Sequence, residues 1–283
     1  MTGPPPGLCG ACAWVRRVSN RRGSSFFMCG RAREDSRFLD NMLEPGDPRT
    51  LTSFAEIFFS KASSDFLSQR TSEELARVTH GAFEFLRGSR PDRVDVQVLN
   101  PDEDVEGWYA PVTVIRTNVS ERPFIVDTIR EYLHAQGLPI EHNVYPVIDV
   151  SRNDAGEVIG VGPSFEGQSR ESLVHCEVPL ITDSDRRAEI EAEIRSRLED
   201  AVAATDDFHP MIDAVNDTVT ELAEKGKSLD ARRDEMEEAQ AFLRWLRDGA
   251  FVFLGYREYG IEDADGGRYV RVVPNSGLGI LRD

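Results

Sequence analysis

The sequence contains no apolar run long enough to cross a membrane. A membrane helix needs about 20 apolar residues, whereas the longest apolar run here is "AFVFLGY" at residues 250–256. A secretory signal is also missing, because the apolar stretch "LCGACAWV" precedes the first arginines and is interrupted by Gly10. We therefore expect a cytoplasmic protein that does not span a membrane.

Cysteine is scarce, with four residues in a chain of 283. Three of them, Cys9, Cys12 and Cys29, crowd the beginning of the chain, and Cys176 stands alone in the apolar stretch "SLVHCEVPL". This distribution argues against a disulfide framework. Cys176 is predicted to be a small buried hydrophobe.

Positive charge is scarce beyond the first 33 residues. The formal net charge is -17, yet residues 1–33 hold six arginines and no acidic residue. The remainder of the chain is therefore strongly acidic and repels phosphate backbones. This charge argues against nucleic acid as a partner beyond residue 50 and leaves only the short basic head able to contact it.

Apolar residues recur at helical spacing in five regions of the chain. "RTSEEL" at residues 70–75 is typical of a helix start and "GSRP" at 88–91 of a helix stop. The predicted helical regions are residues 51–87, 123–136, 182–208, 211–225 and 231–248.

Alternation of apolar and polar residues predicts strands between and after these helices. They cover residues 93–100, 110–119, 138–152, 158–162 and 172–181, and a hairpin at 250–273 turns in "EDADGG". From residue 111 to 208 the order is strand, helix, several strands, helix. This order predicts an α+β fold, an open antiparallel sheet with helices on one face.

Two stretches of the chain resemble a known protein family. "ERPFIVDTIREYL" at residues 121–133 is similar to the first corner of an ACT domain, the small-molecule sensing module of amino-acid metabolism. "FLRWLRDGAFVFLGYREY" at 242–259, followed by "VPNSGLGILRD" at 273–283, resembles the N-terminal region of the large bacterial NAD-dependent glutamate dehydrogenases. The resemblance covers residues 51–283 by order of elements and leaves the head out.

The resemblance implies an ACT-like βαββαβ domain at residues 93–210, flanked by helices. A basic head with its linker occupies residues 1–49 and a helical segment residues 50–92. A helical connector at 211–240 leads to the start of a second, truncated ACT-like or β module at 241–283. The unfinished apolar hairpin in this last region indicates that the natural chain continues and that residues 240–283 promote self-association.

The resemblance also implies a function in which this region does no chemistry itself. The full-length enzymes convert L-glutamate, NAD and water to 2-oxoglutarate, ammonia and NADH, usually as homo-oligomers. This region would then serve regulation or oligomerisation, with the rest of the same polypeptide and other copies of it as partners, and NAD would bind elsewhere in the full-length enzyme. The alternative is a free-standing ACT-type module that senses an amino acid.

The strand-to-helix corner holds the candidate ligand-binding residues. Backbone N–H groups at the start of the 123–136 helix can bind a carboxylate, and Arg122 adds positive charge. By resemblance, however, ACT corners that bind amino acids carry glycine where this chain has Phe124, because the ligand approaches the backbone closely. We therefore expect Phe124 to plug the ligand space or to pack in the core, and the module to have a structural or inter-subunit role. The candidate set is Glu121, Arg122, Pro123, Phe124, Ile125 and Asp127.

Three other groups of residues could be taken for catalytic or binding sites. Asp127, Arg130 and His134 share one helix face, where an exposed ion pair explains the first two. His175 and Cys176 are adjacent on a strand and point to opposite faces, so they cannot share a proton. The aromatic cluster favours core or interface packing over base stacking, given the acidic charge; it comprises Trp245, Phe251, Phe253, Tyr256 and Tyr259.

The glycine string "NSGLGILRD" at residues 275–283 is predicted to be a loop. A dinucleotide site needs a glycine-rich turn between a strand and a helix, with an acidic residue further on. No catalytic residue is therefore assigned in this chain.

The head places Cys9 and Cys12 at the spacing of a zinc knuckle, and Cys29 follows. A structural zinc needs four ligands, so a carboxylate such as Asp35 or Glu44, or a ligand from a second chain, would complete the site. Since the glutamate dehydrogenases are not known to begin in this way, a start nearer Met28 or Met42 and a genuine fusion both stay open.

Overall fold

The computed structural model describes residues 48–162, 168–226, 233–264 and 267–282. The chain divides into two compact units. Unit 1 contains the residues up to Glu121 together with Ile125–Arg195, and unit 2 contains Arg122–Phe124 together with the residues from Ser196 onward. Within the described residues, no helix has both the length and the apolar composition to cross a membrane.

Unit 1 begins with helices whose ends follow from local side-chain capping. The Thr71 hydroxyl accepts the Glu74 N–H at 3.2 Å, while the Glu74 carboxylate accepts the Thr71 N–H at 2.7 Å. This reciprocal pair is a capping box, which satisfies two N–H groups that a helix start otherwise leaves unpaired. The predicted start at residues 70–75 and stop at 88–91 are confirmed, and the helices are α2 (Pro48–Phe59), α3 (Ser64–Ser68) and α4 (Ser72–Gly88).

The rest of unit 1 is an antiparallel sheet, which confirms the α+β fold. The strands are ordered β1-β2-β6-β4-β5, and β3 also pairs with β6. All their pairings are antiparallel, with Ile115 opposite Cys176 in the central pair. The strands are β1 (Asp95–Leu99), β2 (Val112–Ser120), β3 (His142–Val144), β4 (Val147–Arg152), β5 (Val158–Val161) and β6 (Gln168–Pro179).

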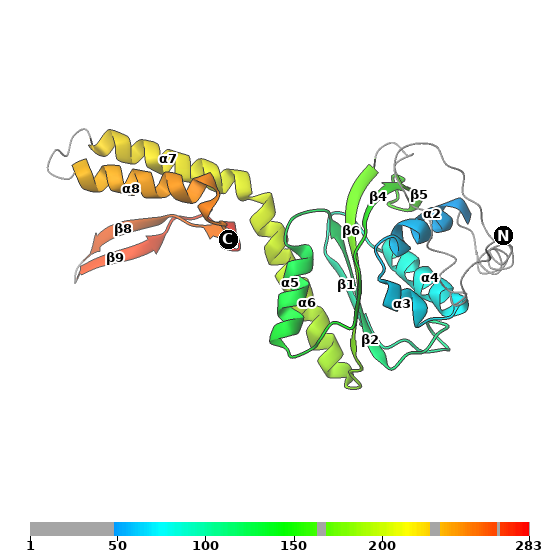
Figure 1. Ribbon diagram of the computed structural model, residues 1–283. Coiled ribbons are helices and arrows are strands. Elements are labelled where there is room, and N and C mark those ends of the chain that lie inside the picture. The colour runs from blue at the N-terminus through cyan, green and yellow to red at the C-terminus, as the bar shows by residue number, and fades with distance from the viewer. Residues whose placement is uncertain (1–47, 163–167, 227–232, 265–266, 283) are drawn as a thin grey trace, which may run out of the picture. The chain divides into compact units, whose positions relative to one another are not determined.

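Helices α5 (Ile125–Ala135) and α6 (Ser184–Asp206) lie on one face of this sheet (Figure 1). Helix α5 buries Ile125, Ile129 and Leu133, one residue per turn, as its amphipathic pattern predicts. Gly137 follows with φ +68°, the left-handed conformation that commonly ends a helix. The corner at residues 121–124 joins the end of β2 to the start of α5.

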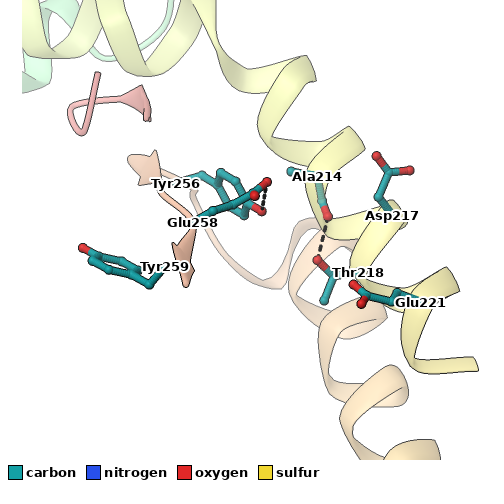
Figure 2. A pocket seen from close by; sticks show the side chains of 7 residues that line it. All are labelled: Ala214, Asp217, Thr218, Glu221, Tyr256, Glu258 and Tyr259. Atoms are coloured by element: carbon teal, nitrogen blue, oxygen red, sulfur yellow. Dashed lines mark hydrogen bonds between the residues drawn. The ribbon is translucent and has the colours of Figure 1, made fainter. Parts of the chain in front are cut away.

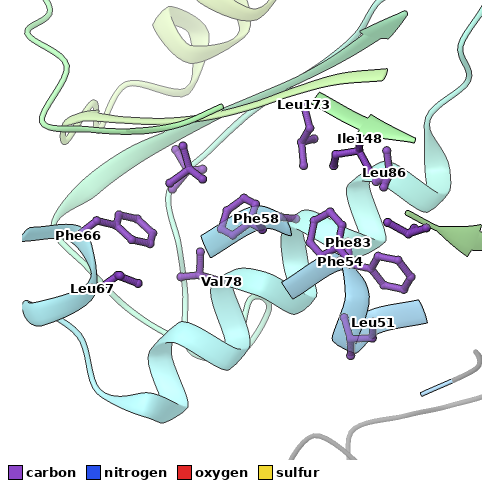
Figure 3. Close-up of a cluster of buried hydrophobic side chains, with 14 of the residues drawn as sticks. Leu51, Phe54, Phe58, Phe66, Leu67, Val78, Phe83, Leu86, Ile148 and Leu173 are labelled. Carbon is purple, nitrogen blue, oxygen red and sulfur yellow. The ribbon is translucent and has the colours of Figure 1, made fainter. Parts of the chain in front are cut away.

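Helices α2, α3 and α4 cover the opposite face of the sheet (Figure 1). Phe54 stacks on Phe58 at 5.6 Å between ring centroids and contacts Phe83 at 5.2 Å. Figure 3 shows these rings beneath Ile148 and Leu173 of the sheet. Because the long central strand β2 is buried along eight successive residues, both faces of the sheet need a covering layer.

The described residues of unit 2 form the end of α6, two further helices that pack together, a π-helical turn and short strands. The predicted hairpin at 250–273 is present as the pair β8–β9, with Tyr259 opposite Val272 and Ala264 opposite Gly267. The hairpin strand starts later than predicted, at Tyr259, and residues 255–256 pair with β10 instead. Residues 246–250 form a π-helical turn in which Gly249 has φ +93°. The elements are α7 (Phe208–Gly226), α8 (Arg233–Trp245), β7 (Gly255–Tyr256), β8 (Tyr259–Ala264), β9 (Gly267–Val272) and β10 (Leu278–Gly279).

Candidate functional site

At the predicted ligand-binding corner, Arg122 contacts the last turn of α6. Its guanidinium donates to the Asp206 carboxylate at 2.7 Å, to the Thr205 hydroxyl at 3.2 Å and to the Val202 carbonyl at 3.3 Å. A cation at a helix C-terminus is favourable, because the final carbonyls there carry partial negative charge. Arg122 therefore stabilises the end of α6 instead of pointing a spare charge at a ligand.

The other polar corner residues form exposed ion pairs. Glu121 lies 3.4 Å from Arg170, and its backbone N–H donates to the Arg170 carbonyl at 2.7 Å. Asp127 pairs with Arg130 at 2.8 Å, as predicted, and His134 is exposed on the same helix. Ile125 is buried in the core, whereas Pro123 is exposed. The corner thus offers a ligand few groups beyond the backbone N–H groups at the start of α5.

Phe124 adopts a left-handed backbone conformation with φ +73°. This conformation costs a residue with a side chain about 1–2 kcal/mol and costs glycine almost nothing. The ring is 47% exposed, so the prediction of core packing for Phe124 is wrong. The backbone keeps the shape that glycine favours, while the side chain is about half exposed.

This conformation gives a test that compares two small substitutions. At most positions alanine is more stable than glycine, because glycine loses more backbone entropy on folding. At position 124 we expect the reverse, with F124G more stable than F124A by about 1 kcal/mol, because only glycine relieves the left-handed strain. Urea unfolding of both variants measures the difference. An alanine variant equal to or more stable than the glycine variant would contradict the assigned backbone conformation.

Beneath α3 and α4, the sheet carries a buried ionic network that the sequence interpretation missed. Arg70, at the end of α3, forms an ion pair with Glu177 of β6, with the two side chains 9% and 0% exposed. The same carboxylate lies 3.2 Å from His175 Nε2. Because an ionised carboxylate only accepts, a neutral His175 donates from Nε2 and leaves Nδ1 without a hydrogen-bond partner among the described residues.

Burial fixes the charge states in this network. The pKa of His175 is lowered, first by burial and then by the positive charges of Arg116 and Arg70, so the ring is neutral. Burial alone would raise the pKa of Glu177, but the hydrogen bond from His175 and the charge of Arg70 outweigh it and lower that pKa. Glu177 is therefore an ionised carboxylate inside the protein, held by Arg70.

Arg116 extends the network across the sheet. It lies directly opposite His175 on β2 and donates to Gln97 at 3.2 Å and to Glu106 at 3.3 Å. Its guanidinium fits against α4 at Gly81, where an added Cβ would lie 2.8 Å from Arg116 Nη2. These contacts join the strand, the loop before β2 and the helix above it.

A second buried carboxylate is satisfied in the same way. Arg152 reaches both oxygens of Glu171 at 3.0 Å each, and Asn118 donates to Glu171 at 2.6 Å. Arg152 also donates to the Leu86 carbonyl in α4 at 3.0 Å. Since protein donors occupy both carboxylates, the two networks hold helices on the sheet. The signal was present in "ESLVHCEV", whose alternation places Glu171, Leu173, His175 and Glu177 on one face.

The neighbouring Cys176 points to the other face of the sheet, as predicted. Its Sγ donates to the Asn143 side-chain oxygen at 3.3 Å, and burial raises the pKa of the thiol to about 12. A thiol with this pKa is protonated near neutral pH and is a poor nucleophile. The His175–Cys176 pair is therefore not a catalytic dyad.

Unit 2 contains an acidic recess of about 430 Å³ (Figure 2). The Tyr256 hydroxyl donates to Glu258 at 3.1 Å, and burial, followed by this hydrogen bond, raises the pKa of Tyr256. Three carboxylates and no basic side chain line the recess, so it repels the carboxylate of an amino acid and the phosphates of a dinucleotide. Its lining is Ala214, Asp217, Thr218, Glu221, Tyr256, Glu258 and Tyr259.

The C-terminal glycine string is held within unit 2 by Asp207, which lies between α6 and α7. Asp207 accepts from both Arg282 Nε and Nη2 at 2.7 Å and from the Gly279 N–H at 2.7 Å. Gly279 has φ +61°, and an added Cβ would collide with the Leu254 carbonyl oxygen. The glycine therefore allows close backbone packing, and its N–H donates to Asp207. Contrary to the prediction, the string is not a loop throughout, because Leu278–Gly279 form the short strand β10, which pairs with β7.

Two further predictions concern the aromatic cluster of unit 2 and the cysteine head. The structure corrects the first in part and does not describe the residues of the second. Trp245, Phe251 and Tyr259 are each more than half exposed, which excludes core packing for them and leaves interface packing as a prediction. Cys9, Cys12 and Cys29, with Asp35 and Glu44, lie outside the described residues. No group of three or more potential metal ligands occurs within the described ranges, and nothing supports zinc.

Comparison with known proteins finds similarity over most of the chain. Residues 54–194 match the family described as glutamate dehydrogenase, ACT1 domain. The NAD-specific glutamate dehydrogenase of Pseudomonas aeruginosa is 33% identical over 224 residues, which is 78% of this chain and 14% of that protein. The enzyme of Halomonas elongata is 30% identical over 247 residues, 86% of this chain and 15% of that protein.

A more distant relative carries the same name. The NAD-specific glutamate dehydrogenase of Mycobacterium tuberculosis is 29% identical over 161 residues, 56% of this chain and 10% of that protein. The chain thus spans about a tenth to a seventh of the length of the curated relatives it matches.

Proposed function

The chain belongs to the family of the large NAD-specific glutamate dehydrogenases, as an N-terminal region with an ACT1 domain, and from this premise we propose that it is a non-catalytic regulatory and assembly region. In the whole protein, L-glutamate, NAD and water would give 2-oxoglutarate, ammonia and NADH in the cytoplasm. The partners of this region are then the rest of the same polypeptide and other copies of it.

The buried charges are the observation that carries the structural part of this proposal. Glu177 and Glu171 lie inside the protein, and Arg70 and Arg152 pair with them there. Catalytic acids and bases need access to a substrate proton, usually from a cleft. The four buried side chains instead hold helices on the sheet. This arrangement is expected of a structural module that supports assembly.

The acidic recess of unit 2 gives independent support. Asp217 and Glu258 disfavour the carboxylates of L-glutamate and the pyrophosphate of NAD, whereas the third carboxylate of the recess, Glu221, is paired with Lys225. A dinucleotide site needs N–H groups or positive charge facing the phosphates. We therefore propose that NAD binds in a part of the whole protein that lies outside this chain.

The test of the enzyme function uses the whole gene product. We expect the purified whole protein to reduce NAD in the presence of L-glutamate, measured by NADH absorbance, and to release ammonia in equal amount. A whole protein that folds and assembles but shows no glutamate-dependent reduction of NAD would contradict the proposed enzyme.

A free-standing amino-acid sensor remains a second candidate, favoured by one observation. Phe124 keeps φ +73°, so the corner retains the backbone shape of a glycine corner. Calorimetric titration of residues 1–283 with the common amino acids separates the two candidates. Saturable binding that F124G strengthens and R122A abolishes would favour the sensor, whereas no binding by either the unaltered chain or F124G supports the structural role.

A further inference from the structure

The strand β1 lies at one edge of the sheet and pairs only with β2 within the described residues. In an antiparallel pair, alternate residues turn their backbone N–H and C=O groups toward the neighbouring strand. The outward groups belong to Val96 and Val98 of β1 and to Val94, the residue before it, because their backbone groups bond to partners on the side away from β2. An edge of this kind is normally a template for another strand.

Two side chains of α6 occupy these outward groups. Arg195 donates from Nη1 to the Val94 carbonyl at 2.8 Å and from Nη2 to the Val96 carbonyl at 3.0 Å. Glu191 accepts the Val98 N–H at 3.1 Å, and it pairs with Arg195 at 3.2 Å. The two residues therefore satisfy one donor and two acceptors along the edge.

The residue spacing along a helix and along a strand explains why one ion pair of α6 can bond to several backbone groups of the β1 edge. Residues four apart on a helix are separated by about 6 Å along its axis. Outward groups two residues apart on a strand are separated by about 6.6 Å. Glu191 and Arg195 thus match the period of the strand edge, and they mimic the donors and acceptors of an additional strand. Val94 and Val96 are each only 6% exposed under this cover.

The sequence of β1 would suit self-pairing if the cover were removed. Two copies of "DVQVL" placed antiparallel about Gln97 set Val96 opposite Val98 of the second copy and Asp95 opposite Leu99. No like charges then face each other, and the outward N–H and C=O groups of Val96 and Val98 come into register. A second copy of this chain is therefore the partner that the bare edge fits.

We propose that Glu191 and Arg195 close the β1 edge against strand addition by a second copy of the chain. Unit 1 consequently does not assemble by continuing its sheet into a neighbour through β1. Any association of the chain uses other surfaces. The inference concerns the fold of unit 1 and does not depend on the enzyme function proposed above.

The test compares the unaltered chain 1–283 with E191A/R195A. We expect the double variant to form dimers with an apparent dissociation constant at least about tenfold lower, measured by light scattering over a range of concentrations. Two controls keep the edge closed: E191Q retains an acceptor for the Val98 N–H, and D127A/R130A removes an exposed helical ion pair that touches no strand. Both are expected to behave like the unaltered chain.

Hydrogen exchange supplies a readout that does not depend on the double variant folding well. In the unaltered chain, the Val98 amide should be protected despite its place on an edge, and E191A should lower that protection by about tenfold. A freely exchanging Val98 amide in the unaltered chain would overturn the proposal. So would a folded double variant whose dimerisation matches that of D127A/R130A.

Discussion

Replacing Arg70 with methionine is expected to lower the free energy of unfolding of unit 1 by about 3–5 kcal/mol. The substitution removes the cation that pairs with Glu177, whose side chain is 0% exposed, and strands an ionised carboxylate inside the protein. Methionine keeps most of the apolar stem, so lost packing contributes little. The measurement is urea unfolding followed by the fluorescence of buried Trp108, with W14F and W245F removing the other tryptophans.

Two companion variants identify the stranded charge as the cause. R87M removes an ion pair of 2.7 Å whose partners are 41% and 44% exposed, and it should cost less than about 0.5 kcal/mol. R70M/E177Q removes the charge as well as its partner and should recover part of the stability lost by R70M. If R70M costs no more than R87M, Glu177 is not held as an isolated buried carboxylate.

Replacing Phe58 with alanine is expected to destabilise unit 1 by about 3–5 kcal/mol. Phe58 is fully buried between α2 and the sheet, where its ring meets Phe54 at 5.6 Å and His175 at 5.8 Å. The loss combines the removed apolar surface with a cavity that rigid neighbours cannot fill. Urea unfolding measures this loss, with F242A as the control.

The control distinguishes burial from aromatic content. Phe242 is 56% exposed on α8, so F242A should cost less than about 1 kcal/mol even though its ring stacks on Trp245. Equal effects of F58A and F242A would mean that α2 is not part of the core of unit 1. That result would also remove the reason for treating α2, α3 and α4 as the second covering layer of the sheet.

The sequence predicts those parts of the fold that depend on local order. The helix start at Thr71, the apolar stripe of α5 and the pairing of β8 with β9 all appear where periodicity and turn residues place them. Each depends on residues within a few positions of one another. The family resemblance then supplies the ACT-like sheet, which the comparisons support.

The candidate site is much less accessible to sequence reasoning. Arg70 and Glu177 are 107 positions apart, and no local pattern shows that they meet. Arg122 contacts Asp206, which lies 84 positions away. The sequence pattern therefore could not predict that Arg122 stabilises the end of α6. The left-handed backbone at Phe124 is a tertiary constraint on a residue type that avoids it. Contacts over such separations depend on how the sheet assembles.

The measurement that tests the central claim most directly is NADH formation by residues 1–283 alone, with L-glutamate and NAD present. Circular dichroism of the same sample verifies that the chain is folded. We expect no NADH above the rate without protein, because the buried charges are paired and the recess of unit 2 is acidic. Glutamate-dependent NADH formation that scales with the concentration of this chain would contradict this claim.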